Sequence, residues 1–211
     1  MPRRKYTLDL TNIKADTQDK YYWLGFIAGD GNIAKNEARL RIELKSLDKE
    51  QLINFNNFMG SNTPLVERVN NNGCNCTCLS INSAELKRYL AQYNLVPAKS
   101  KIFTLPLENI PNEYIFDFLR GLFDADGSLS FRGQDIKHPI LEIVVGTKEC
   151  AEQIKTIFNW DTKISEFNNK SAYLVRKEGL EAVKPILSKL YEHSTENTRL
   201  KRKYELWSLI K

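Results

Sequence analysis

The chain of 211 residues contains only two histidines, His138 and His193, which lie far apart in the sequence. So few histidines give no basis for a histidine-based metal nuclease or a Ser/His/Asp triad. No run of 18 or more apolar residues argues for a transmembrane helix, and no G-x-x-x-x-G-K-S/T loop is present to cradle phosphates. The opening residues, MPRRKYTLDL, lack the apolar stretch of a signal peptide. We therefore expect an intracellular protein, in the cytoplasm or an organelle.

Cysteine is also sparse, at four residues, and without a secretion signal free thiols are expected. Three of them alternate along the chain as Cys74, Cys76 and Cys78. On a strand, alternate Cβ atoms stand about 7 Å apart, whereas thiolates around one zinc ion lie within about 4 Å of each other. The pattern favours small apolar side chains on the core face of a strand over a metal site.

The rest of the composition is that of an ordinary folded domain with a modest excess of positive charge. Hydrophobic residues make up 42% and charged residues 27% of the chain, and the net charge is +5. A basic balance favours a polyanionic partner, although many basic proteins bind nothing anionic. The length suffices for one large domain or two small ones.

The strongest pattern in the sequence is an internal repeat. WLGFIAGDG occupies residues 23–31 and LRGLFDADG occupies residues 119–127, at an offset of 96 residues. Each stretch has glycine at its third and last positions and aspartate before the last glycine, so Asp30 matches Asp126. A repeat at one fixed offset indicates two related halves.

The elements expected after each motif follow the same order. They are an alternating strand (38–46 and 141–149), a helix (47–58 and 150–158), two strands joined by a turn (64–70 with 76–82, and 162–167 with 171–176) and a closing helix (83–95 and 178–193). We predict an α+β fold of two pseudo-symmetric αββαββα halves, each a curved antiparallel sheet with helices on one face. The halves are placed at 1–96 and 114–211, joined by a linker at 97–113 that contains three prolines.

The repeated motif has a physical requirement of its own. Small residues let two helices approach closely, and the motifs supply glycines at matching positions, including Gly25 and Gly121. Such packing would bring both helix C-termini together and place Asp30 beside Asp126. Two carboxylates at two helix C-termini are unfavourable without a cation, and Mg²⁺ or another hard cation would offset them. The alternative is that each aspartate is a turn residue before glycine, with no metal.

The two stretches resemble the paired signature motifs of the LAGLIDADG homing endonucleases, in their single-chain, two-motif form. LRGLFDADG departs from the family pattern at Arg120 and Phe123, and in WLGFIAGDG Ala28 and Gly29 replace the usual acidic and small pair. The resemblance extends over roughly residues 20–210 and includes the order of elements. It implies that both sheets form one DNA-binding saddle, with two active sites over the minor groove at its centre.

The resemblance implies that the last acid of each motif binds metal, which gives Asp30 and Asp126, with the backbone at Gly29 and Ala125 as further ligands. Two or three Mg²⁺ ions are the implied cofactor, and Mn²⁺ or Ca²⁺ can substitute in binding. Asp124 matches an acid that the family does not need for metal, so a helix-capping or packing role is expected. Each site would hydrolyse one strand with metal-activated water, leaving a 3′ hydroxyl and a 5′ phosphate.

The family also implies basic residues near the two scissile phosphates, from the segment after the last helix of each half. In the first half the matching residue is Lys99 or Lys101. In the second they lie among Lys201, Arg202 and Lys203, of which Lys201 and Lys203 are the candidates. A lysine there could stabilise charge in the transition state. The alternative for the second cluster is a solvated helix face.

Polar residues on the outward face of each sheet suit contacts to base edges and phosphates in the major groove. The expected partner is double-stranded DNA with a long, weakly palindromic target site, bound by a monomer and weakened steeply by salt. The DNA-binding candidates are Lys35, Arg39, Arg41, Lys45, Arg68, Asn70 and Asn75 in the first half, with Arg132, Gln134, Lys137, Lys163, Asn168 and Lys170 in the second.

Three other interpretations remain open. The first is a protein of the same fold that binds DNA or RNA without cleavage, as a transcription regulator or intron maturase, which loss of the metal aspartates would favour. The second is a metal-dependent enzyme acting on a small phosphoester. The third is an intein-embedded domain, but splicing signatures are absent from the ends, MPRRKY and WSLIK. A free-standing endonuclease encoded within an intron or between genes fits better.

Overall fold

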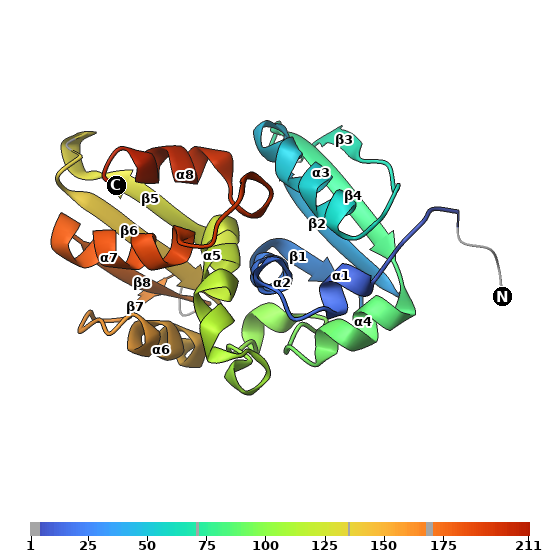
Figure 1. Ribbon diagram of the computed structural model, residues 1–211, viewed down its shortest axis with the longest axis horizontal. Helices are drawn as coiled ribbons and strands as arrows, with labels where there is room; N and C mark the ends of the chain where they lie inside the picture. The colour runs from blue at the N-terminus through green and yellow to red at the C-terminus, as the bar shows by residue number, and fades with distance from the viewer. Residues whose placement is uncertain (1–4, 71, 135, 168–170) are drawn as a thin grey trace.

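Two helices lie side by side between two four-stranded sheets (Figure 1). The computed structural model describes the whole chain except residues 1–4, 71, 135 and 168–170 and the side chains of Gln134 and Phe167. The N-terminal half contains α1 (Thr11–Lys14), α2 (Gln18–Asp30), β1 (Gly31–Ile33), β2 (Arg39–Lys45), α3 (Lys49–Phe58), β3 (Val66–Val69), β4 (Asn75–Asn82) and α4 (Ala84–Ala91). The C-terminal half contains α5 (Ile115–Asp126), β5 (Gly127–Phe131), β6 (Pro139–Val145), α6 (Lys148–Ile157), β7 (Ser165–Phe167), β8 (Ala172–Glu178), α7 (Leu180–Tyr191) and α8 (Lys201–Ser208).

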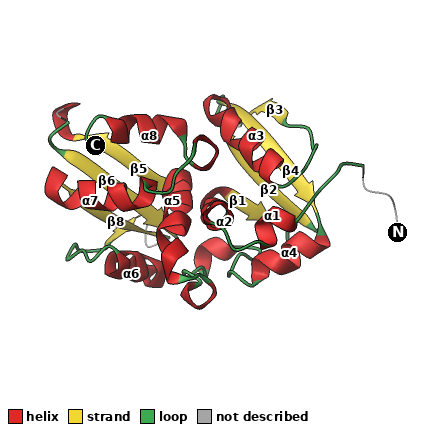
Figure 2. Ribbon diagram, viewed as in Figure 1, coloured by secondary structure: helices red, strands yellow, loops and turns green. Residues whose placement is uncertain are grey.

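The two halves repeat one topology, and the predicted fold class is confirmed. The strand orders are β1-β2-β4-β3 and β5-β6-β8-β7, and every pair of neighbouring strands is antiparallel. Helices cover one face of each sheet (Figure 2). Two helices, α1 and α8, lie outside the repeated order. No helix in the described part of the chain is long and apolar enough to cross a membrane.

Helices α2 and α5 pack backbone to backbone at the centre of the molecule. A Cβ atom built on Gly25 would lie 1.9 Å from the Phe118 carbonyl oxygen, and one on Gly121 would lie 1.9 Å from the Tyr22 carbonyl oxygen. Real Cβ contacts are never so short, so only glycine fits at either crossing point. Because the crossing is symmetric, both helices end at the same place.

Between α4 and α5 the chain forms three short 3₁₀ turns, η2 (Lys99–Lys101), η3 (Leu107–Asn109) and η4 (Asn112–Tyr114). This connection is anchored on the C-terminal half. The Thr147 hydroxyl donates to the Phe103 carbonyl at 2.5 Å, and the Leu105 N–H donates to Gln153 Oε1 at 2.8 Å. The turn that carries Lys99 is therefore held against the second half.

Each sheet has one face under the helices and a second face, called here the polar face. On β2, Leu40, Ile42 and Leu44 are buried beneath the helices, so Arg39, Arg41, Glu43 and Lys45 lie on the polar face. Because an antiparallel register pairs residues of the same face, the partners of Glu43 and Lys45, Cys78 and Cys76, lie on the polar face as well.

The prediction that these cysteines face the core is therefore wrong. Both are buried, but beneath the polar side chains of their own face, and Thr77 between them points to the helices. In NCTCLSIN, either alternate set of residues could have formed the core face, and only the pairing with β2 decides between them.

Candidate metal centre

The two motif aspartates lie where the paired helices end. Asp30 is the last residue of α2 and Asp126 is the last residue of α5. A Cβ atom built on Gly29 would lie 2.3 Å from Ala125 Cβ and 3.0 Å from Asp126 Oδ2. The Asp126 carboxylate therefore lies against the last turn of α2, next to Gly29, the residue that precedes Asp30.

This crowding perturbs both carboxyl groups. Burial, and after it the neighbouring Asp126, raises the pKa of Asp30 to about 7, against the opposing effect of Lys203 and Lys99. Asp126 reaches solvent more than Asp30 does. Partial burial nevertheless raises the pKa of Asp126, and the positive charges of Lys99 and Lys203 oppose that shift. The raised pKa values of these two neighbouring carboxyl groups indicate that the positive charge around them is insufficient. A divalent cation would supply the missing charge.

The terminal carbonyl groups of the helices are capped by two buried lysines. Lys203 Nζ donates to the carbonyl oxygens of Phe123, Asp124 and Gly127 at 2.6, 2.8 and 2.6 Å, and so uses all three of its donors on the end of α5. Lys99 Nζ donates to the Gly29 carbonyl at 3.2 Å, at the end of α2. These ammonium groups offset the negative helix ends.

Burial lowers the pKa of Lys203 to about 8, opposed chiefly by Asp124, and it also lowers the pKa of Lys99. The other two predicted lysines lie elsewhere. Lys101 is exposed, and Lys201 is exposed on α8, where it lines a separate pocket. The structure thus brings Lys99 and Lys203 to the aspartates, and it does not bring Lys101 or Lys201 there.

Asp124 is fully buried and joins three segments of the C-terminal half to α2. Its carboxylate accepts hydrogen bonds from the hydroxyls of Tyr22 and Tyr191 at 3.0 and 3.2 Å and from the Leu200 N–H at 2.7 Å. Leu200 immediately precedes α8. Asp124 on α5 therefore holds the start of α8, while Lys203 on α8 holds the end of α5. This is the capping and packing role expected for Asp124.

We predict that Lys203→Met lowers the free energy of unfolding by about 3 kcal/mol or more, because it leaves buried carbonyl groups and the Asp124 carboxylate without their cation. Urea denaturation followed by circular dichroism measures the effect. Lys201→Met, on the exposed side of the same helix, is the matched control and should change stability by less than about 0.5 kcal/mol. Equal effects of the two substitutions would contradict the capping role.

The donor set at the aspartates fits a hard divalent cation. Two carboxylates beside the backbone carbonyls of two helix ends offer oxygen ligands of the kind that Mg²⁺ prefers. No cluster of three or more His, Cys, Asp or Glu side chains suited to a metal occurs among the described residues. Water or phosphate oxygens would therefore complete the coordination, as is usual for Mg²⁺. Ligation by the backbone of Gly29 and Ala125 stays a prediction, and the Gly29 carbonyl also accepts from Lys99.

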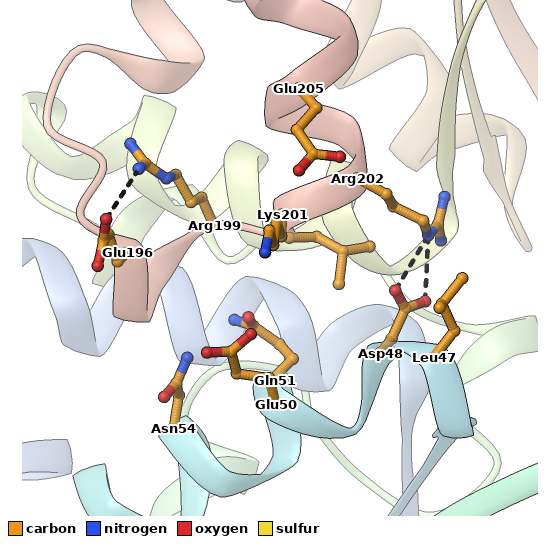
Figure 3. Close-up of a pocket in the computed structure, with 11 residues that line it drawn as sticks. Leu47, Asp48, Glu50, Gln51, Asn54, Glu196, Arg199, Lys201, Arg202 and Glu205 are labelled. Atoms are coloured by element: carbon orange, nitrogen blue, oxygen red, sulfur yellow. Dashed lines mark hydrogen bonds and ion pairs between the residues drawn. The ribbon is translucent and has the colours of Figure 1, made fainter.

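A pocket of about 210 Å³ opens beside Asp30. Its lining includes Lys45 from β2, Ala125 from α5, and Asp48 and Arg202, which form an ion pair between the two halves. Arg202 Nε donates to both Asp48 carboxylate oxygens, at 3.2 and 3.1 Å. Figure 3 shows this pair at the edge of a neighbouring pocket of about 290 Å³ between α3 and α8, which also contains Lys201.

Four of the predicted DNA-binding residues lie on the polar face of the first sheet. Arg39, Arg41 and Lys45 extend from β2, and Arg68 extends from β3 on the same face. Gln134, by its side chain, and Asn168 and Lys170 lie outside the described residues. The remaining candidates are exposed or half-buried in loops and at strand ends: Lys35, Asn70, Asn75, Arg132, Lys137 and Lys163.

The sequence interpretation missed the acids that orient these arginines. Glu43 Oε2 accepts from Arg41 at 2.7 Å and also from Arg68. On the second sheet, Arg176 donates to Glu142 at 2.9 Å and to Glu178, which also binds Arg132. Alternation along β8 could have placed Arg176 and Glu178 on the polar face. Only the strand register shows that they meet Glu142.

The family model for the WhiA LAGLIDADG-like domain matches residues 115–203, the segment that contains α5, Asp126 and Lys203. Residues 115–203 therefore form a LAGLIDADG-like domain. Over 90% of its length the chain is similar to the LAGLIDADG meganuclease I-AabMI bound to uncleaved DNA, at 12% identity and a TM-score of 0.62, covering 89% of that chain. It is also similar to the N-terminal LAGLIDADG domain of DUF199/WhiA, at 17% identity and a TM-score of 0.54, covering 94% of this chain and 92% of that one.

At these identities the two structures establish the fold alone. A further similarity is to a DNA polymerase from Thermococcus hydrothermalis, with 34% identity over 112 residues. The match spans 52% of this chain and 7% of the length of the polymerase.

Proposed function

We propose that this protein is a site-specific DNA endonuclease that hydrolyses both strands with divalent cations held at Asp30 and Asp126. The observation that carries the proposal is the meeting of two carboxylates at the ends of two packed helices. Divalent cations at such a place neutralise phosphate charge and make a water molecule a stronger nucleophile. The chain itself would bind those cations through the two aspartates and hold the helix ends in place through Lys99 and Lys203.

DNA would lie along the two polar faces. The arginines there are held by Glu43, Glu142 and Glu178, so they are preorganised to donate to base edges and phosphates. The strand registers pair Gly31 with Ile42 and Gly127 with Ile143, which makes Arg41 the counterpart of Glu142. Because corresponding positions carry opposite charge, the two half-sites would differ in sequence, and a monomer would bind one long asymmetric target.

Selection of cleaved sites tests the proposal. A random or genomic DNA pool is incubated with the protein and Mg²⁺, and the new ends are captured and sequenced. We expect one long, asymmetric site cut on both strands, with 3′ hydroxyl and 5′ phosphate ends. Binding of a specific site without cleavage in Mg²⁺ or Mn²⁺ would contradict the endonuclease function.

A second candidate is a DNA-binding protein of the same fold that does not cleave. The observation in its favour is that the matching family model is that of the WhiA LAGLIDADG-like domain. A parallel selection for binding in Ca²⁺ separates the two candidates. An endonuclease would cut the selected sites once Mg²⁺ replaces Ca²⁺, whereas a non-cleaving protein would only retain them.

The raised pKa of Asp30 predicts a pH dependence of stability. Its folded-state pKa of about 7 lies above the ordinary value of 3.8. Between these pH values the folded protein keeps a proton on Asp30 that the unfolded chain has already released. The resulting stabilisation is present in full below about pH 4, declines as the pH rises and is lost once the pH passes 7. Asp30→Asn lacks this contribution to the pH dependence of stability.

The melting temperature of Asp30→Asn, measured without metal, should therefore rise relative to wild type between pH 5 and pH 8. An effect on the order of 1 kcal/mol corresponds to about 2–4 °C for a chain of this size. Mg²⁺ should in turn stabilise the wild type more at pH 8 than at pH 6, because the cation needs the ionised carboxylate. A temperature difference that stays constant with pH would contradict the perturbed carboxyl group.

A further inference from the structure

The polar faces of the two sheets differ along the second strand of each sheet. On β2 this face carries Arg39, Arg41, Glu43 and Lys45. On β6 every second residue from Leu141 to Val145 is buried beneath the helices. The polar face of β6 therefore carries the residues between them, Ile140, Glu142 and Val144, and two of these three are aliphatic.

The aliphatic residues of β6 stand at positions that are charged in the first half. The strand registers that align the two sheets place Ile140 where the first sheet has Arg39, and Val144 where it has Glu43. Charged groups bind polar atoms, whereas hydrocarbon is stabilised when it covers another apolar group. The two faces should therefore recognise different groups of a ligand.

A third aliphatic residue extends this surface. Leu174 on β8 pairs with Val144 in the antiparallel register, so both lie on the same face with their Cβ atoms about 5 Å apart. Next along the strand, Glu142 pairs with Arg176, which donates to it at 2.9 Å. Ile140 follows beyond this ion pair. All three aliphatic side chains are half-buried, so the face presents hydrocarbon on both sides of a charged pair.

The extent of this surface argues against a protein partner. Three half-buried side chains expose far less than the roughly 800 Å² per partner that a stable protein interface buries. They also lie beside Arg176, whose guanidinium group suits an anionic partner. Double-stranded DNA combines both features, because its phosphates are negative and its major groove exposes the 5-methyl group of thymine.

We propose that Ile140, Val144 and Leu174 recognise thymine by its 5-methyl group in the half of the target that lies on the second sheet. The first sheet, whose arginines suit the O6 and N7 atoms of guanine, reads the other half by hydrogen bonds. The inference rests on the proposed function, which places DNA on the polar faces, and adds to it the base preference of each half-site.

The strand geometry also sets the spacing of the thymines. Ile140 and Val144 are four residues apart on β6, a distance of about 13 Å at roughly 3.3 Å per residue. Base pairs of DNA rise by about 3.4 Å each. The two aliphatic positions should therefore meet thymines about four base pairs apart, with the base pairs between them facing Arg176.

Replacement of thymine by uracil tests the inference, because uracil lacks only the 5-methyl group. The target is selected by binding in Ca²⁺, each thymine is changed to uracil in turn, and the affinity is measured in Ca²⁺. At the thymines that face the second sheet, each change should weaken binding by about fourfold, the effect of one buried methyl group. In the other half-site it should change the affinity by less than about 1.5-fold, because the contacts there go to other atoms.

Two substitutions assign the contacts to residues. Val144→Thr keeps a β-branched side chain of the same shape but replaces a methyl group by a hydroxyl. It should weaken binding of the thymine target by about fourfold and remove the uracil effect at one position. Ile140→Thr should do the same about four base pairs away. Ile53→Ala, at an exposed aliphatic residue of α3, is the matched control and should keep the wild-type pattern.

The outcomes separate this inference from the endonuclease function. A uracil scan that Val144→Thr and Ile140→Thr leave unchanged, or a second half-site without thymine, would overturn the inference even if the protein cleaves in Mg²⁺. Uracil sensitivity that these substitutions remove, in a protein that never cleaves, would support the inference and refute the endonuclease function. Oligomers that Val144→Thr dissociates, with no change in the uracil scan, would make this face an interface between copies and overturn the inference. Failure to select any DNA would contradict both.

Discussion

Asp126→Asn is expected to abolish cleavage of one DNA strand and Asp30→Asn that of the other, each by roughly 10³-fold or more, so that neither variant makes double-strand breaks. The reason is that asparagine keeps the size of the side chain but removes the charge that a divalent cation requires. The aspartates lie at the helix ends rather than on the polar faces of the sheets. Both variants should therefore bind the target in Ca²⁺ with dissociation constants within a few-fold of wild type.

Strand-specific labels on the selected target measure both losses. Asp9→Asn, at an exposed carboxylate beside α1, is a matched control and should cut like wild type. If either motif variant cut both strands at the wild-type rate, the assignment of the metal site would be wrong. If either lost binding as well, the aspartate would be needed for the fold rather than for chemistry.

Gly121→Ala should lower the free energy of unfolding by about 3–5 kcal/mol, a loss larger than most single substitutions cause. The new methyl group would lie 1.9 Å from the Tyr22 carbonyl oxygen and 2.6 Å from the Phe26 nitrogen. Because those atoms belong to a buried helix backbone, the clash is relieved only if α2 and α5 move apart. Gly25→Ala should have a comparable effect through the Phe118 carbonyl.

Urea denaturation gives the loss directly. Gly73→Ala is a suitable control, because no atom lies within 4 Å of its added methyl group, although its φ of +76° adds some strain. We expect the cost at Gly121 to exceed that at Gly73 by about 2 kcal/mol or more. Similar costs at the two positions would contradict the close packing of the motif helices.

The repeat in the sequence was sufficient to predict the helix pair, both sheets and the meeting of Asp30 with Asp126. These features follow from local periodicity and from one offset of 96 residues. Contacts between segments distant in the sequence could not be predicted this way. The pair of Asp48 and Arg202 joins residues 154 positions apart, and no local pattern in either segment points to the other.

Arg120 shows why a motif alone is insufficient. It departs from the family pattern and is completely buried in α5. Its guanidinium donates to Asp117 Oδ1 at 2.7 Å and to the carbonyls of Leu190 and Thr198, both at 2.9 Å. A buried arginine needs such partners, and the two carbonyl groups come from the end of α7 and the turn before α8. The sequence predicted that Asp30 and Asp126 meet, and the structure brings them together, but the sequence could not show how α8 is attached beside them.

Lys203 illustrates the same limit. Its position in the sequence predicted a basic residue near a scissile phosphate, with a solvated helix face as the alternative. The structure instead directs its three donors to backbone carbonyls of α5. Arg202, the neighbour that was not retained as a candidate, faces the pocket beside Asp30. Which of the two neighbouring residues, Arg202 or Lys203, faces the pocket depends on how α8 packs. Asp124 fixes the start of α8 by accepting a hydrogen bond from the Leu200 N–H.

The most direct test of the paired metal site is anomalous diffraction from crystals of the protein bound to its selected DNA and soaked in Mn²⁺. The account predicts Mn²⁺ peaks between the helix ends, within about 2.0–2.2 Å of carboxylate oxygens of both Asp30 and Asp126. Peaks that avoid either aspartate, or no peak between α2 and α5 in a complex with bound DNA, would contradict it.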